Sequence, residues 1–93
     1  MQIPSYFKIG GQEYKVQIED HLDQEEYGLY SYTPPLIRLS RYTDGEQIPE
    51  NQIEASFWHE LFHAFQYMYN CEIDEAQAQC FSNFMMEFLE SKK

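Results

Sequence analysis

The sequence predicts an α+β fold in which a short antiparallel sheet at the N-terminal end precedes two packed helices. Three observations favour this class. Short runs of alternating apolar and polar residues, separated by Gly and Pro, fill residues 1–50, and such alternation is typical of strands. Apolar residues recur at helical spacing in residues 51–91. The length of 93 residues fits one domain, so we expect residues 1–93 to fold as a unit.

The expected strands form two pairs. In the first pair, apolar residues alternate in YFKI before Gly10-Gly11 and in YKVQI after it, which is a hairpin signal. The second pair is expected in EYGLYSYTPPLIRLSRY. There, Pro34-Pro35 marks the loop, because proline cannot donate a ladder hydrogen bond inside a sheet.

A first helix is expected over about residues 52–69. It follows the turn-forming stretch TDGEQIPEN, in which Asn51 is a candidate N-cap. Glu54 stands three residues later, as in a capping box. The predicted apolar face of this helix consists of Trp58, Leu61, Phe62, Phe65 and Tyr69.

A second helix is expected over residues 75–91, after the interruption NCEID. Asp74 is its candidate N-cap, with Gln77 at the answering position. Cys80 is expected to be a small core residue at the edge of the apolar face. We expect the two helices to pack on each other and on the sheet. The predicted apolar face consists of Ala78, Phe81, Phe84, Met85, Phe88 and Leu89.

The formal net charge is −10, from 16 acidic and 6 basic residues. A surface of this sign repels nucleic-acid backbones, so direct DNA or RNA binding is not expected, whereas basic protein partners are compatible with it. No N-terminal signal segment and no apolar run of membrane-spanning length is visible. We therefore expect a cytoplasmic protein without a membrane partner, with Cys71 and Cys80 as reduced thiols.

The stretch His59-Glu60-Leu61-Phe62-His63 falls inside the first expected helix. Residues four apart lie one turn apart on one helix face, so His59 and His63 can direct two imidazoles at one metal ion. Glu60 lies beside the first of them, from where its carboxylate can reach a water on the metal rather than the metal itself. The pattern predicts a Zn²⁺ site with Glu60 as the catalytic base. A zinc that only holds the fold together would use the same two histidines.

A catalytic zinc needs three protein ligands and an open position, so a third ligand is expected. Glu75 is our choice, because it opens the second helix, where the backbone dipole favours a carboxylate. Asp74 remains an alternative, although a capping side chain is already engaged. Glu72 is interpreted as a capping or solvated residue. Cys71 could ligate zinc as a thiolate, and it would then favour a structural site.

The run HELFHAFQYMYNCEIDEAQAQCFSNFMMEF resembles the small gluzincin-like zinc metallopeptidases of phages and mobile elements, which are related to the ImmA/IrrE type. The resemblance includes Ala64 after the second histidine and an E-x-x-A-x-x-F pattern in the second helix, and before this run it is only architectural. It implies a zincin-like domain in which His59, His63 and Glu75 hold Zn²⁺ and Glu60 is the general base.

The resemblance further implies a protein or peptide substrate that pairs with an exposed sheet edge. The segment 36–40 is the candidate edge. Peptide hydrolysis also needs a hydrogen-bond donor for the developing oxyanion. Spacing does not select among the candidates, which are Tyr30, Tyr32, Tyr67, Tyr69 and His21.

Two functions are compatible with these features. The first is a phage-associated zinc metallopeptidase that cleaves a protein such as a repressor or another host regulator. The second is a non-catalytic acidic binding protein, a DNA mimic or inhibitor of a host factor, with a structural metal site or none. A continuous acidic stripe away from the histidines would favour mimicry. A cleft running over the histidines would favour hydrolysis.

Overall fold

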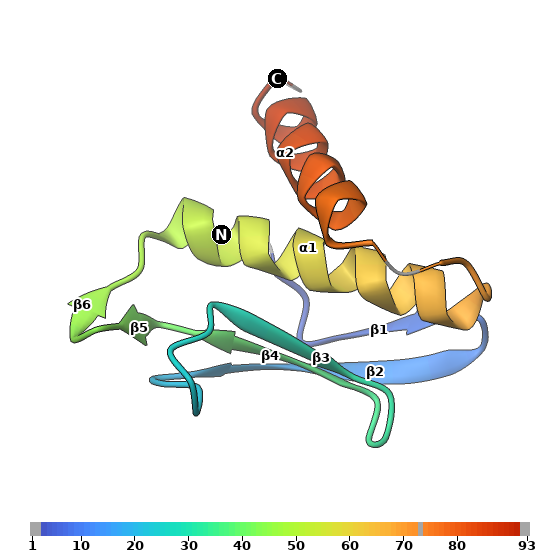
Figure 1. Cartoon of the computed structure of the whole chain (residues 1–93), viewed down its shortest axis with the longest axis horizontal. Coiled ribbons are helices and arrows are strands. Elements are labelled where there is room, and N and C mark those ends of the chain that lie inside the picture. Colours follow the sequence, from blue (N-terminus) through green and yellow to red (C-terminus); the bar gives the residue numbers. More distant parts are fainter. Residues whose placement is uncertain (1–2, 73, 92–93) are drawn as a thin grey trace.

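The computed structural model describes residues 3–72 and 74–91, and it combines a mixed four-stranded sheet with two helices (Figure 1). The predicted α+β class is confirmed. Among the described helices, none is long and apolar enough to cross a membrane. In chain order the elements are β1 (Tyr6–Ile9), β2 (Gln12–Glu19), β3 (Gly28–Ser31), β4 (Leu36–Ser40), β5 (Tyr42–Thr43), β6 (Glu46–Gln47), α1 (Glu50–Met68) and α2 (Glu75–Ser91).

Both predicted strand pairs form. β1 pairs antiparallel with β2, and β3 pairs antiparallel with β4. Gly10 and Gly11 have φ angles of 58° and 81°, a region that residues with a side chain rarely adopt, so the first turn needs the Gly-Gly pair. Pro34 and Pro35 lie in the loop between β3 and β4, as expected.

The prediction of an antiparallel sheet is wrong at the centre of the sheet. The strand order is β1-β2-β4-β3, and β2 and β4 run parallel. After β2, the chain crosses to the far edge as β3 and returns as β4 into the place beside β2. This order puts the more apolar segment, LIRLS, in the middle, where Ile37 and Leu39 are fully buried. The segment 36–40 is therefore not the edge, and β3 is the edge strand on that side.

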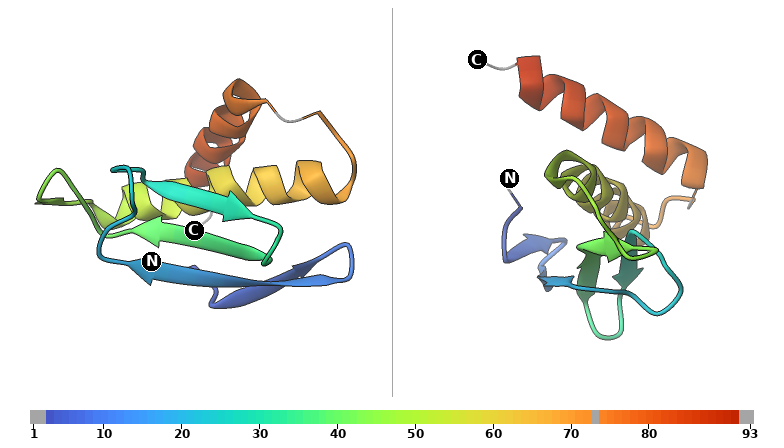
Figure 2. Two further views of the ribbon diagram at one scale, coloured as in Figure 1. Left: turned by 60° about the horizontal axis from the view of Figure 1, so that its bottom comes forward. Right: turned by 90° about the vertical axis from the view of Figure 1, so that its left-hand side faces the viewer.

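Helix α1 covers one face of the sheet, as the views in Figure 2 show. It begins at Glu50, because the carbonyl of Pro49 already accepts the first helical N–H groups, including that of Ile53 at 3.1 Å. The predicted N-cap Asn51 consequently lies inside the first turn, and no side chain caps this helix. The core between α1 and the sheet consists of Ile37, Leu39, Ile48, Ile53 and Phe57.

The predicted apolar face of α1 is only partly correct. Trp58 and Leu61 pack against the core, but the prediction omitted Phe57, which is buried and contacts the rings of its neighbours. Phe65 and Tyr69 are exposed and lie against each other, whereas Met68 and Tyr67 of the same turns face the β1–β2 turn and β3. Apolar spacing therefore located the helix, but it did not identify the side that faces the sheet.

Helix α2 crosses α1 on the side away from the sheet (Figures 1 and 2). Over the described residues α2 packs on α1 rather than on the sheet, so the prediction that both helices cover the sheet is wrong. At the crossing, small residues allow close approach: Ala78 and Ser82 are buried, and the hydroxyl of Ser82 donates to the carbonyl of Ala55 at 2.6 Å. Phe81 stacks on Phe62 of α1, with ring centroids 4.9 Å apart.

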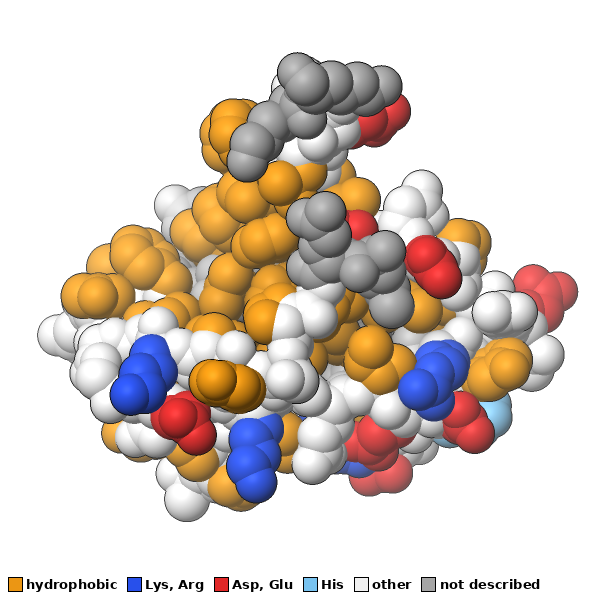
Figure 3. Space-filling view, turned by 180° about the vertical axis from the view of Figure 1, so that it is seen from behind, with side chains coloured by type: hydrophobic (Ala, Val, Ile, Leu, Met, Phe, Trp, Pro, Cys, Tyr) orange, Lys and Arg blue, Asp and Glu red, His pale blue; other side chains and the backbone are white. Residues whose placement is uncertain are grey.

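The remaining apolar side of α2 lies on the surface. Phe84 and Phe88 stack on each other and are 61% and 47% exposed. Cys80 is also exposed, so its assignment to the core is wrong, and both cysteines are free thiols. The space-filling view in Figure 3 shows apolar side chains exposed on the part of the molecule from which α2 rises. α2 is thus anchored by its small residues, and two of its aromatic residues, Phe84 and Phe88, face outward.

Candidate metal centre

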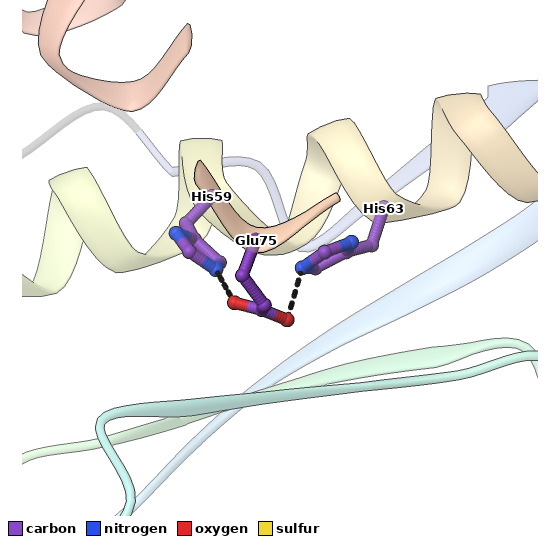
Figure 4. A group of neighbouring side chains, drawn as sticks. All are labelled: His59, His63 and Glu75. Atoms are coloured by element: carbon purple, nitrogen blue, oxygen red, sulfur yellow. Dashed lines mark hydrogen bonds and ion pairs between the residues drawn. The ribbon is translucent and has the colours of Figure 1, made fainter. Parts of the chain in front are cut away.

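The three predicted ligand side chains, His59, His63 and Glu75, lie together and are called the triad below. One atom from each of His59, His63 and Glu75 falls within 4.8 Å of the others. Glu75 Oε2 is 2.8 Å from His59 Nε2, and Glu75 Oε1 is 2.9 Å from His63 Nε2. Figure 4 shows the carboxylate from the start of α2 between the two imidazoles of α1. The four-residue spacing on α1 brings the ring centroids to 5.0 Å from each other.

The loop between the helices decides that Glu75 reaches the histidines. α1 ends in a turn with Asn70 at a φ of 56°, and the amide N–H of Cys71 donates to the carbonyl of Gln66 at 2.7 Å. The buried side chain of Gln66 in turn donates to the carbonyl of Glu72 and to Gln77 of α2. A polar residue of α1 thus holds the chain as it turns back over this helix.

Asp74, the alternative third ligand, is the N-cap of α2. Its Oδ1 accepts the backbone N–H groups of Ala76 at 2.8 Å and Gln77 at 3.3 Å, as the sequence predicted for this cap. Neither Asp74 nor the other acidic or thiol candidates of this loop join the triad. Glu72 contributes its backbone to the loop, and Cys71 is exposed.

The two histidines differ in their surroundings. His59 Nδ1 lies 3.2 Å from Gln79 Oε1, and because an amide oxygen only accepts, Nδ1 is the donor of this pair, while Nε2 lies on the side of Glu75. Gln79 is fixed by donating to Asn83 at 3.1 Å. His63 is only 6% exposed, and neither of its ring nitrogens has a hydrogen-bond partner among the described residues. Its 2.9 Å approach to Glu75 is an ion-pair distance without hydrogen-bond alignment.

The two carboxyl groups of the site, those of Glu75 and Glu60, have pKa values shifted in opposite directions. The hydrogen bond from His59 is the main cause that lowers the pKa of the Glu75 carboxyl. Glu60 is half-buried, and this desolvation raises the pKa of its carboxyl to about 7, with a further increase from the charges of Glu75 and Glu26. Such a pKa suits a group that takes and returns a proton near neutral pH.

Glu60 is held against the edge strand. A Cβ atom added at Gly28 of β3 would lie 3.1 Å from Glu60 Cγ and 3.2 Å from Leu39 Cδ2. The missing side chain of Gly28 therefore makes room for the Glu60 carboxyl beside β3. Sequence reasoning missed this residue, because nothing local indicates which strand lies beside α1.

These side chains share one cleft of about 690 Å³ between β3, α1 and the start of α2. Gln79, which the sequence did not single out, lines it together with the triad. Gln79 stands four residues after Glu75, one helical turn away, and this spacing is the one sequence feature that could have placed it beside the predicted ligands. The lining residues are Glu25, Glu26, Tyr27, Gly28, Leu29, Tyr30, Gln52, Ala55, Ser56, His59, Glu60, His63, Glu75, Gln79 and Ser82.

Of the five candidate oxyanion donors, only Tyr30 lines the cleft. Its hydroxyl is 2.8 Å from that of the buried Tyr14, which engages it inside the protein. Tyr32 packs against Tyr67 with tilted rings, and both lie outside the cleft lining. The others also lie outside it, with Tyr69 exposed and His21 exposed beside Tyr42.

Comparison of this chain with known protein families, with curated proteins and with solved structures gives no match. Any function inferred for this chain therefore comes from the residues of the cleft.

Proposed function

We propose that this protein is a zinc-dependent hydrolase of peptide bonds, of the small gluzincin-like, ImmA/IrrE-related type that its motif resembles. One observation carries the proposal. Two imidazoles from α1 and a carboxylate from α2 converge within 4.8 Å, in a cleft that also holds the half-buried Glu60. Two nitrogen donors and one carboxylate oxygen form a ligand set that catalytic zinc sites use, with a fourth position left for water or substrate.

The surroundings of the triad fit a cation. Among the described residues His63 Nδ1 has no partner and Nε2 meets only the Glu75 carboxylate, at 2.9 Å without hydrogen-bond alignment. Such incomplete pairing is costly for a buried imidazole, and ligation of a cation through Nε2 would reduce that cost. Gln79 would keep His59 in the tautomer that presents Nε2, since ligating histidines usually donate their other N–H to an acceptor. Glu75, with its lowered carboxyl pKa, would ligate as a carboxylate.

Zinc bound here would act as a Lewis acid that polarises the substrate carbonyl and lowers the pKa of a coordinated water to about 7. Glu60 would take the proton from the attacking water and deliver it to the leaving amine. Its contact with Gly28 of β3 would hold the carboxyl in place for both transfers. The half-buried position of Glu60 would limit the access of bulk water to this proton.

The substrate would be a protein or an extended peptide. β3 forms one wall of the cleft and is an edge strand, so its outer backbone groups have no strand partner in the sheet. An extended segment could pair with β3 and pass the triad. We therefore assign the substrate-pairing edge to β3 rather than to the segment 36–40, which is a central strand of the sheet.

In the alternative function, a non-catalytic acidic binding protein, the negative surface would itself bind a basic partner. The criterion set by the sequence was a cleft over the histidines for hydrolysis, or a separate acidic stripe for mimicry. The cleft contains both histidines and Glu60, which supports hydrolysis.

Metal content and proteolysis measured on the same samples test the proposal. We expect one zinc per chain in the wild type by elemental mass spectrometry, and cleavage of fluorescently labelled casein. Glu75→Gln should lose most of the metal, whereas the matched control Glu72→Gln, which changes an acid outside the triad, should keep it. Glu60→Gln should keep fold and metal but lower kcat/KM by roughly 10²- to 10⁴-fold.

Three results would contradict this assignment. A wild type that takes up no zinc would remove the hydrolase and make the acidic binding protein the leading function. A zinc-loaded wild type without proteolysis would leave a structural site. Loss of metal in Glu60→Gln would make Glu60 a ligand rather than the base.

A further inference from the structure

The cleft that holds the triad is acidic on a second side. Glu25 and Glu26, immediately before β3, line it together with Glu60 and Glu75. Neither Lys nor Arg occurs among its described lining residues. If zinc is bound, its two positive charges are balanced by Glu75 and an ionised Glu60, so the carboxylates of Glu25 and Glu26 remain as uncompensated negative charge.

These two carboxylates differ in how they are engaged. Glu25 Oε2 accepts the backbone N–H of Asp44 at 2.8 Å and the hydroxyl of Thr43 at 3.3 Å, so its side chain ties the loop to the β5–β6 turn. Glu26 accepts one backbone N–H, from Gln24 at 3.2 Å, through Oε1. No described residue donates to Glu26 Oε2, which leaves this oxygen for a ligand.

One further observation favours a binding cleft over a solvated acidic loop. The same cleft contains His63, which is only 6% exposed, and its Nδ1 has no hydrogen-bond partner among the described residues. Arg38 lies close enough for the charge of Glu26 to influence it. Its guanidinium, however, is held by Glu19 through two hydrogen bonds of 2.7 and 3.0 Å, so it makes no hydrogen bond to Glu26.

We propose that the cleft selects basic peptide segments, with Glu26 contacting a Lys or Arg side chain of the substrate close to the scissile bond. This specificity depends on the proposed hydrolase function. The overall charge of −10 would favour the approach of the same class of substrate, because it attracts basic chains over a distance. Segments that are basic and extended would meet Glu26 as they lie along β3, while acidic segments would be repelled.

The first experiment separates recognition from chemistry. Zinc-loaded Glu60→Gln protein, which should not cleave, is titrated with capped, fluorescent decapeptides that differ only in one central residue: Lys, Gln or Glu. We expect the Lys peptide to bind about fivefold more tightly than the Gln peptide, the upper end for an exposed ion pair, and the Glu peptide to bind most weakly. Higher salt should reduce the difference.

Substitutions in the same Glu60→Gln protein assign the preference to Glu26. Adding Glu26→Gln should abolish the advantage of the Lys peptide, and Glu26→Lys should reverse it in favour of the Glu peptide. Glu87→Gln is the matched control, because it removes the same charge from an exposed position of α2 outside this cleft, and it should leave the preference unchanged. Equal binding of the three peptides, or a preference that survives Glu26→Gln, would overturn the proposal.

A second experiment uses the active wild type and a mixed library of capped peptides, with cleavage sites read by mass spectrometry. We expect Lys and Arg to be enriched within a few residues of the cut, and Glu26→Gln to remove this enrichment. Cleavage without such enrichment would overturn the specificity and leave the hydrolase function intact. Absence of cleavage by zinc-loaded wild type would contradict the hydrolase, whereas the binding experiment would still decide the role of Glu26.

Discussion

Helices α1 and α2 are both amphipathic in sequence, but the fold uses them differently. α1 lies between the sheet and α2, and its Ile53 and Phe57 belong to the core. α2 packs on α1 through Ala78 and Ser82, while Phe84 is 61% exposed. Apolar spacing thus identifies a helix and its apolar face but not what covers that face. α2 contributes less to the core than to the site, because its first residue carries the carboxylate that meets the histidines.

The largest expected effect contrasts one aromatic residue from each helix. Phe57 is 2% exposed and packs edge-on against Phe7 and Trp58. Phe57→Ala should lower the free energy of unfolding by about 3–5 kcal/mol through lost burial and the cavity left behind. Phe84→Ala, the matched change on α2, should alter it by less than about 0.5 kcal/mol, because the side chain is exposed and Ala favours a helix.

Urea unfolding of the metal-free proteins, followed by circular dichroism, measures both values. A large loss in Phe84→Ala would mean that the aromatic side of α2 is covered, by a second copy or another part of the chain. A small loss in Phe57→Ala would contradict the description of the core.

A second prediction concerns the cleft-facing side of α1. In the metal-free folded protein the pKa of Glu60 is raised to about 7 from its ordinary value of 4.5. The folded state therefore binds this proton more tightly than the unfolded state. The unfolding free energy should fall as pH rises from about 4.5 to about 7, by about 3 kcal/mol, and this contribution should stay constant above pH 7.

Glu60→Gln should lack this fall. The difference in unfolding free energy between the two proteins, measured by urea titration in EDTA at several pH values between 5 and 8, cancels the other titrating groups that they share. Parallel curves for the wild type and the variant would show that Glu60 ionises in the folded protein as it does in the unfolded chain.

A third prediction tests whether α2 supports the site beyond supplying Glu75. Gln79→Ala removes the acceptor for His59 Nδ1 and should weaken zinc binding about 10- to 100-fold, as loss of such supporting partners typically does. Gln79→Glu keeps an acceptor at this position and should retain or increase the affinity. Competition with a chromophoric chelator measures both. If Gln79→Ala bound zinc as tightly as wild type, His59 would not need this partner.

Much of this fold and site could be predicted where local signals sufficed. Gly10-Gly11 marked a hairpin, Asp74 marked the start of α2, and the spacing of His59 and His63 placed both on one helix face. The parallel pairing of β2 with β4, and hence the edge position of β3, depends on how two hairpins assemble. Local propensity and periodicity do not encode that assembly. The roles of Gln79 and Gly28 follow from the same long-range placement, so no local pattern revealed them.

The smallest expected effect concerns the contact between β3 and α1 that positions the proposed base. In Gly28→Ala the new methyl group would lie 3.1 Å from Glu60 Cγ and 3.2 Å from Leu39 Cδ2, so one of these side chains must shift. A displacement of Glu60 by a few tenths of an ångström should lower kcat by about tenfold, because proton transfer depends on position, while zinc content stays unchanged. Leu39→Val, alone and combined with Gly28→Ala, separates the two contacts, since valine lacks the crowded Cδ2 atom. If the loss of kcat comes from Glu60, it should persist in the double variant relative to Leu39→Val. Recovery of full kcat in the double variant would instead assign the effect to the core around Leu39, and the role of Gly28 in holding Glu60 would be wrong.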